Sequence, residues 1–184
     1  MSSYKLAHTD SEFRVQAFAT GLLSIFAHSP TFAARDFKGV FRVDEGGPGH
    51  MSLDLEVRAD SLALLDRVPL ADRRDIEGRM RSETLEVSAY PEIRYQAQDI
   101  SFSPDGPGRY HLRINGRLSL HGVTRDHSME AELRLYNDGL RLLGRSTLLM
   151  SDYHIKPVTA VGGTIRLKDE LQISFELLGL PEES

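Results

Sequence analysis

Apolar and polar residues alternate along most of the chain, which is the period-two pattern of β-strands with one buried face. Near the N-terminus, Phe13, Val15 and Ala17 alternate with polar residues, and the segments 37–43 and 51–57 repeat this pattern. Five later segments, one of them a weaker mixture, also read as strands: 93–97, 114–120, 129–135, 140–150 and 171–177. The pattern therefore predicts about eight strands.

Turn-forming residues separate several of these strands. Glycine, proline, asparagine or aspartate cluster at 46–49, 105–108 and 137–139. Such residues provide positive φ, block strand pairing or bond their own backbone, so they are typical of hairpin turns. We therefore expect the neighbouring strands to be antiparallel.

The segment 118–133 contains two histidines, His121 and His127, with polar residues 124–126 between them. If His121 ended one strand and His127 began the next, the two side chains could face each other across the ladder. A metal site would need a third ligand, and none is obvious. We therefore favour a strand, a reversal with turn charges at 124–126 and a second strand. This arrangement places five apolar residues on one face: Leu118, Leu120, Met129, Ala131 and Leu133.

The alternation stops between residues 60 and 88. The segment 71–82 has acidic residues early and basic residues late, which suits the helix dipole. Ile76 and Met80 are four residues apart and give this helix one narrow apolar edge. A short capped turn is also expected to run through Leu65. We expect one or two short helices packed over a barrel end or a sheet face.

About eight antiparallel strands with one apolar face each must close into a barrel or fold into two packed sheets. The interior of an eight-stranded barrel is either filled by side chains or holds one small ligand. Small residues in the inward rows could fill the taper of a solid core or leave an apolar tube, and the pattern leaves both open. These residues are Ala17, Gly39, Ala97, Gly116 and Ala131.

The composition narrows the function. A chain of 184 residues, 40% hydrophobic and 27% charged, predicts a single globular domain over 1–184. The net charge of −5, without a basic stripe, argues against nucleic acid as a partner. No segment is long and apolar enough to span a membrane, and the first residues lack a secretory signal pattern, so we expect a cytoplasmic protein.

Few features indicate catalysis. The absence of cysteine excludes thiolate metal sites and cysteine nucleophiles. Motifs for phosphate, dinucleotide, zinc or serine-nucleophile chemistry do not occur either. An enzyme would need acids and bases assembled from scattered positions, which the sequence leaves open, and we predict no cofactor and no metal.

The least polar segment is 21–37, in which His28 and Arg35 are the strongly polar side chains before Asp36. It is either a buried strand, loop and strand with one hydrogen-bonded histidine, or a portal where His28 or Arg35 meets the polar head of a ligand. The sequence leaves both possibilities open.

Three segments carry a family resemblance: His-Thr-Asp-Ser-Glu-Phe-Arg-Val at 8–15, Tyr-Pro-Glu-Ile-Arg-Tyr at 90–95 and Leu-Ser-Leu-His-Gly-Val-Thr-Arg at 118–125. With them the chain resembles the YceI-like, polyisoprenoid-binding family over about residues 4–178. The resemblance implies a lipocalin-like, extended antiparallel barrel with a helix near one end, no catalysis and often a homodimer. It also implies a long isoprenoid or other amphiphilic lipid in the barrel's tunnel, and so favours an occupied tunnel.

The chain departs from the family pattern at two points. It has no tryptophan, although an N-terminal tryptophan is usual, and its segment 26–31 differs from the commoner version. Since that segment is a plausible tunnel lining, the identity of the ligand stays open.

Our main hypothesis is therefore a lipid-binding barrel, with His28 and Arg35 near the polar head of the ligand. Candidates for the tunnel wall are Phe13, Val15, Phe41, Leu53, Leu55, Tyr95, Leu118, Met129 and Leu133. One alternative is a metal-binding or hydrolytic protein that uses His121, His127 and perhaps His28. Another is a solid barrel that acts through its surface as an interaction module.

Overall fold

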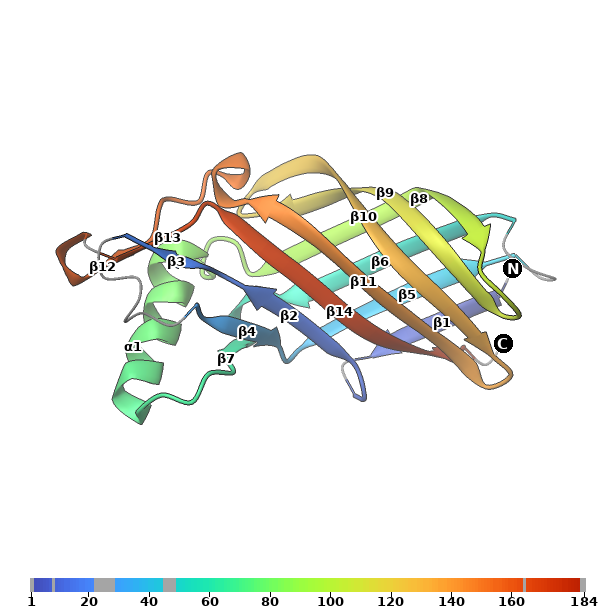
Figure 1. Cartoon of the computed structure of the whole chain (residues 1–184), viewed down its shortest axis with the longest axis horizontal. Coiled ribbons are helices and arrows are strands. Elements are labelled where there is room, and N and C mark those ends of the chain that lie inside the picture. The colour runs from blue at the N-terminus through green and yellow to red at the C-terminus, as the bar shows by residue number, and fades with distance from the viewer. Residues whose placement is uncertain (1, 8, 22–28, 45–48, 164, 183–184) are drawn as a thin grey trace.

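The computed structural model describes residues 2–7, 9–21, 29–44, 49–163 and 165–182. Within them, eight antiparallel strands close into an elongated barrel (Figure 1). In order around the ring, the strands are β1 (Ser2–Ala7), β5 (Phe37–Val43), β6 (Met51–Arg58), β8 (Glu92–Pro104), β9 (Arg109–Leu120), β10 (Val123–Tyr136), β11 (Gly139–Leu149) and β14 (Glu170–Pro181). The predicted all-β, eight-stranded, lipocalin-like architecture is confirmed.

Strand β14 belongs to two parts of the wall. Its C-terminal end pairs with β1, whereas residues 172–176 pair with β2 (Glu12–Gln16). β2 is followed in the sheet by β4 (Thr31–Ala34) and β7 (Leu62–Leu64), and β7 has an open edge. One end of the barrel is therefore walled by this short extension.

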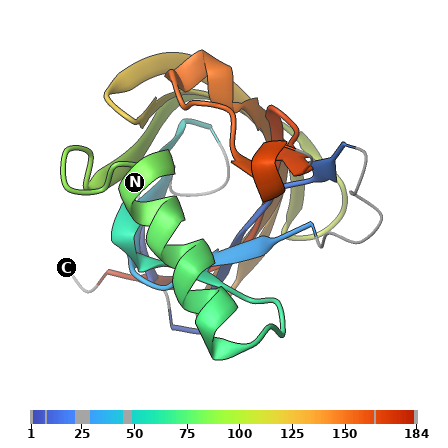
Figure 2. The same ribbon diagram turned by 90° about the vertical axis from the view of Figure 1, so that its left-hand side faces the viewer.

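The helical segments gather at the end that carries the extension. Helix α1 (Leu70–Arg79) continues into a π-helical turn, η3 (Met80–Thr84), and Figure 2 shows α1 running obliquely across the barrel end. Among the described residues, the short 3₁₀ turns are η2 (Ala59–Ser61), η4 (Met150–Tyr153) and η5 (Val161–Gly163). A small sheet lies at the same end and contains β3 (Ala19–Thr20), β12 (Thr159–Ala160) and β13 (Ile165–Leu167). The predicted helix at a barrel end is confirmed, and both chain termini lie at the opposite end.

Two details differ from the sequence prediction. The run at 13–17 corresponds to β2, which is outside the eight-strand ring, and β1 was missed because only Tyr4 and Leu6 carry its short alternation. The turn expected through Leu65 is wrong, since Leu62–Leu64 pairs with β4 as β7.

No helix among the described residues is long and apolar enough to cross a membrane.

The β9–β10 hairpin confirms the predicted strand, reversal and strand, with a tighter turn than expected. Its two central residues, His121 and Gly122, have φ of 52° and 75°, as a two-residue turn with positive φ at both positions requires. Residues 124–126 therefore belong to β10 and not to the turn. His127 lies opposite Gly116 and not opposite His121, so the two histidines do not face each other across the ladder.

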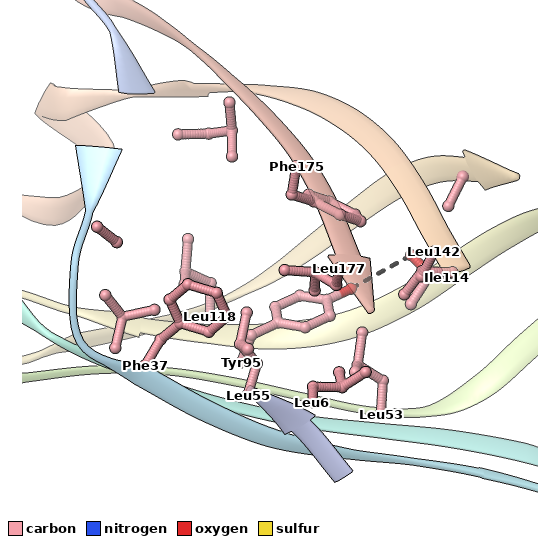
Figure 3. Packing of buried hydrophobic residues seen from close by; sticks show 14 of the residues in the cluster. Leu6, Phe37, Leu53, Leu55, Tyr95, Ile114, Leu118, Leu142, Phe175 and Leu177 are labelled. Atoms are coloured by element: carbon pink, nitrogen blue, oxygen red, sulfur yellow. Dashed lines mark hydrogen bonds between the residues drawn. The ribbon is translucent and has the colours of Figure 1, made fainter. Parts of the chain in front are cut away.

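Aromatic rings fill the middle of the barrel (Figure 3). The ring of Tyr95 lies against Gly116, and its hydroxyl donates to the carbonyls of His127 (2.9 Å) and Ile114 (3.3 Å). At Gly116, where the sequence left open whether a small residue gives a solid core or a tube, this ring fills the space.

Phe175 lies in the same way against Gly144, its direct partner across β11 and β14. Toward the chain termini the interior is solid, since ten large side chains there are less than 2% exposed. They are Leu6, Phe41, Met51, Leu53, Leu112, Ile114, Leu133, Leu140, Leu142 and Leu177.

Replacing Gly116 with alanine should destabilise the barrel. The new Cβ would lie 2.6 Å from the ring of Tyr95 and from the carbonyl oxygen of Gln96, so we expect a loss of about 1–3 kcal/mol in the free energy of unfolding. Urea denaturation measures this loss. Gly78→Ala is the matched control, because nothing lies near that position and alanine favours a helix by up to about 1 kcal/mol. Equal stability of the two variants would contradict the packing of Tyr95 on Gly116.

Candidate ligand-binding site

A cavity of about 790 Å³ lies between α1 and the end of the barrel that carries the extension β2, β4 and β7. We call this end the upper half of the barrel, and the end that carries the chain termini the lower half. Its inner surface is apolar and is formed by strands of the extension, by the inner side of the helical segment and by the chain near β13. The apolar lining includes Val15, Ala17, Phe32, Leu62, Leu64, Ile76, Met80, Leu85, Met150, Leu167 and Leu171. This volume lies within the range of small-ligand pockets.

Charged side chains surround the mouth of the cavity. Asp72, Asp75, Arg79 and Glu83 come from α1 and η3 and are exposed. Lys156 and Arg166 lie on the other side and are exposed as well. The site therefore has an apolar interior and a rim of mixed charge, which suits a ligand with an apolar body and a polar end.

Three phenylalanines, Phe13, Phe37 and Phe175, pack together deeper in the barrel than the residues that line the cavity, and we call them the aromatic floor. Along β2, Val15 lines the cavity, whereas Phe13, the next inward residue, does not. The Phe13 ring stacks on that of Phe175 with centroids 6.1 Å apart and planes 9° apart, and lies 6.3 Å from the ring of Phe37. The cavity therefore ends where the packed half of the barrel begins.

Helix α1 is attached to the open edge of β7 by charged side chains. Glu77 accepts the backbone N–H of Leu64 at 2.9 Å, and Arg73 donates to the carbonyl of the same residue. Arg81 donates to the carbonyl of Leu62 at 3.4 Å. An unpaired strand edge exposes such groups, and here the helix satisfies them. No residue of α1 is fully buried, so these contacts are a main part of its anchorage.

Arg79 connects α1 to the opposite side of the mouth. Its Nη2 donates to the carbonyl of Thr159 at 3.2 Å, and its Nε lies 3.4 Å from Glu83. The contact with Thr159 narrows the mouth between α1 and the small sheet.

His121 fastens the β9–β10 turn to its surroundings. Its Nδ1 donates to the carbonyl of Tyr153 at 3.1 Å, and its Nε2 lies 2.7 Å from the carboxylate of Glu86. The ring of Tyr90 packs against it with centroids 4.5 Å apart. These contacts account for both ring nitrogens without a metal.

His127 lies elsewhere, on β10. Its Nε2 is 3.0 Å from the hydroxyl of Ser146, and burial lowers the pKa of the imidazole below its ordinary value. Within the described part of the chain, no three histidine or acidic side chains are arranged to hold a metal ion. The metal alternative therefore has no cluster of ligands among these residues.

A family model for the YceI-like domain matches residues 4–178. The chain belongs to the YceI-like family. Among curated protein sequences, none matches this chain.

Solved structures share this YceI-like fold at low sequence identity. The Burkholderia cenocepacia protein BcnA superposes with a TM-score of 0.71 at 13% identity, over 94% of this chain and 98% of its own. A polyisoprenoid-binding domain from Saccharophagus degradans gives 0.69 at 13% identity, over 97% and 98% of the two chains. A Campylobacter jejuni YceI protein gives 0.61 at 13% identity, over 82% and 83%.

The residues predicted to form the tunnel wall of this YceI-like barrel lie in three places: the cavity lining, the aromatic floor and the packed interior. Val15 lines the cavity and Phe13 belongs to the aromatic floor beneath it. The others lie in the packed interior, where Met129 is partly exposed and the rest are buried: Phe41, Leu53, Leu55, Tyr95, Leu118, Met129 and Leu133. Of the predicted tunnel-wall residues, a ligand in the cavity would therefore contact Val15 alone.

Of the two polar candidates, only Arg35 is among the described residues. Arg35 is exposed in the turn between β4 and β5 and does not line the cavity. His28 lies outside the described residues. The role of either side chain with a ligand stays a prediction.

Sequence reasoning missed most of the cavity lining, which comes from residues 62–85 and 150–171. These segments have little alternation, so they gave no signal for a strand with an inward face. The apolar edge of Ile76 and Met80 was the exception, since both side chains line the cavity.

Removing the Glu77 carboxylate should loosen α1 from β7. Glu77→Ala leaves the N–H of Leu64 without its acceptor and removes the partner of Arg73 (3.7 Å) and Arg81 (3.4 Å). We expect hydrogen exchange to become roughly tenfold faster in β7 and α1, as a local loss of about 1–3 kcal/mol implies, and to stay unchanged in β9 and β10. Arg74→Ala, an exposed change on the same helix, is the control. Unchanged exchange in Glu77→Ala would contradict this anchorage.

Proposed function

We propose that this YceI-like protein binds an amphiphilic lipid, with the apolar chain in the cavity beneath α1 and the polar end at the charged mouth. The observation that carries the proposal is the cavity itself, about 790 Å³ with an apolar interior and a charged rim. Burial of apolar surface contributes about 25 cal/mol per Å², so an apolar chain gains affinity along its whole length.

An isoprenoid is the chain type that the comparisons support. The Saccharophagus degradans domain with this fold is described as polyisoprenoid-binding. The branched prenyl chain also suits a lining that is rich in leucine and contains isoleucine and methionine, whose side chains pack around irregular shapes. We also propose that the protein binds its ligand without catalysis, that it is located in the cytoplasm and that it forms a homodimer.

The packed half of the barrel bears on the interaction-module alternative. Its interior offers no space to a ligand, so the lower half contributes a scaffold. The cavity at the α1 end favours ligand binding over a role confined to the surface.

A charged side chain in the cavity lining should abolish lipid uptake. Ile76→Asp places a carboxylate in the apolar lining without adding a partner, and a bound chain would have to desolvate it. We expect at least roughly a tenfold loss of affinity for farnesol in a fluorescent-probe displacement assay, since 1.4 kcal/mol corresponds to tenfold.

Leu149→Asp is the matched control, because Leu149 is an exposed apolar residue of β11 outside the cavity. It should leave the affinity unchanged. Uptake by Ile76→Asp equal to that of the unmodified protein would refute the proposed cavity, and failure of the unmodified protein to take up any lipid would refute the function.

A further inference from the structure

We propose that the aromatic floor limits the length of the apolar chain that the barrel can hold, to about five isoprene units. This inference rests on the proposed function and adds the size class of the ligand. It identifies Phe13, Phe37 and Phe175 as residues that determine specificity.

The position of the floor is fixed by the strand register. Phe13 lies directly opposite Phe175 in the β2–β14 pair, one inward row below Val15 and Ile173. Since Val15 lines the cavity and the Phe13–Phe175 pair does not, the cavity ends above this pair, and a chain that extended deeper into the barrel would run against these rings.

The rings have little freedom to move aside. Phe175 is 7% exposed and Phe37 is 3% exposed, and the ring of Phe175 fills the space left by Gly144. Beyond it, Leu142 and Leu177 are 0% and 1% exposed, so the interior directly below the floor is packed. A bound chain could displace such a ring only by pushing it into side chains that are already close-packed around it, which is unfavourable.

The volume of the cavity above the floor sets the length of the apolar chain that the barrel can hold. At about 30 Å³ per non-hydrogen atom, the share that a water molecule takes in the liquid, a cavity of about 790 Å³ holds roughly 25 such atoms. Five isoprene units contain the same number of carbon atoms. Longer chains would extend through the mouth into water and gain no further affinity from the barrel.

The test measures affinity for a series of all-trans prenyl alcohols with two to nine isoprene units, by displacement of a fluorescent probe and by native mass spectrometry. In the unmodified protein we expect affinity to rise by roughly tenfold or more with each added unit and then to level off near five units. Phe175→Ala removes the six ring carbons above the packed interior, so its plateau should move to a chain about one isoprene unit longer.

Phe13→Leu is a second variant with a milder effect on folding, because Phe13 is partly exposed. It should shift the plateau in the same direction by less. Phe102→Ala is the matched control, since this exposed aromatic residue of β8 lies outside the cavity. It should leave the plateau in place.

The outcomes separate the two proposals. Affinity that keeps rising beyond five units in the unmodified protein, or a plateau that stays in place in folded Phe175→Ala and Phe13→Leu, would overturn the floor while leaving lipid binding intact. If the unmodified protein binds no prenyl alcohol of any length, the proposed function fails and the floor has no role in specificity.

Discussion

The structure depends on how aromatic rings fill the cross-section of the barrel. An eight-stranded barrel is wide enough to need large side chains at its centre, and here Tyr95 and Phe175 reach inward over Gly116 and Gly144. The absence of a side chain at each glycine lets the ring lie against the backbone of the neighbouring strand. These two pairs convert a potential tube into a solid lower half, and the aromatic floor marks its upper limit.

The half of the barrel that holds the cavity depends on a different constraint, because the sheet above the aromatic floor does not close. Strands β2, β4 and β7 extend the sheet beside β14 but leave β7 with an unpaired edge. Arg73, Glu77 and Arg81 satisfy that edge from α1 and η3, so the same contacts protect the edge and hold the helix over the barrel end. The cavity exists because the helix covers the end without filling it.

Much of the fold could be predicted because its signals are local. Alternation identified seven strands of the ring, and the apolar edge of Ile76 and Met80 predicted a helix at a barrel end. The short strand β1 was missed because six residues carry too little alternation to distinguish it from a loop.

The site was less predictable because it depends on contacts between distant segments. Nothing in the sequence near Gly116 shows that Tyr95 will lie over it, since that follows from the register of β8 and β9. Inward-facing residues such as Leu53 and Leu133 were therefore assigned to a tunnel wall, whereas the structure buries them in the packed half. For the same reason, the lining from residues 62–85 and 150–171 emerged only from the three-dimensional arrangement.

The central claim is that an apolar chain enters beneath α1 and stops above Phe175. Photo-cross-linking with a prenyl alcohol that carries a diazirine at the tail end tests this claim most directly. The account predicts labelled peptides from β2, β7 and the start of β14, which line the bottom of the cavity near Val15, Leu64 and Leu171. Labelling confined to the outer wall, or at the barrel end that carries the termini, would contradict it.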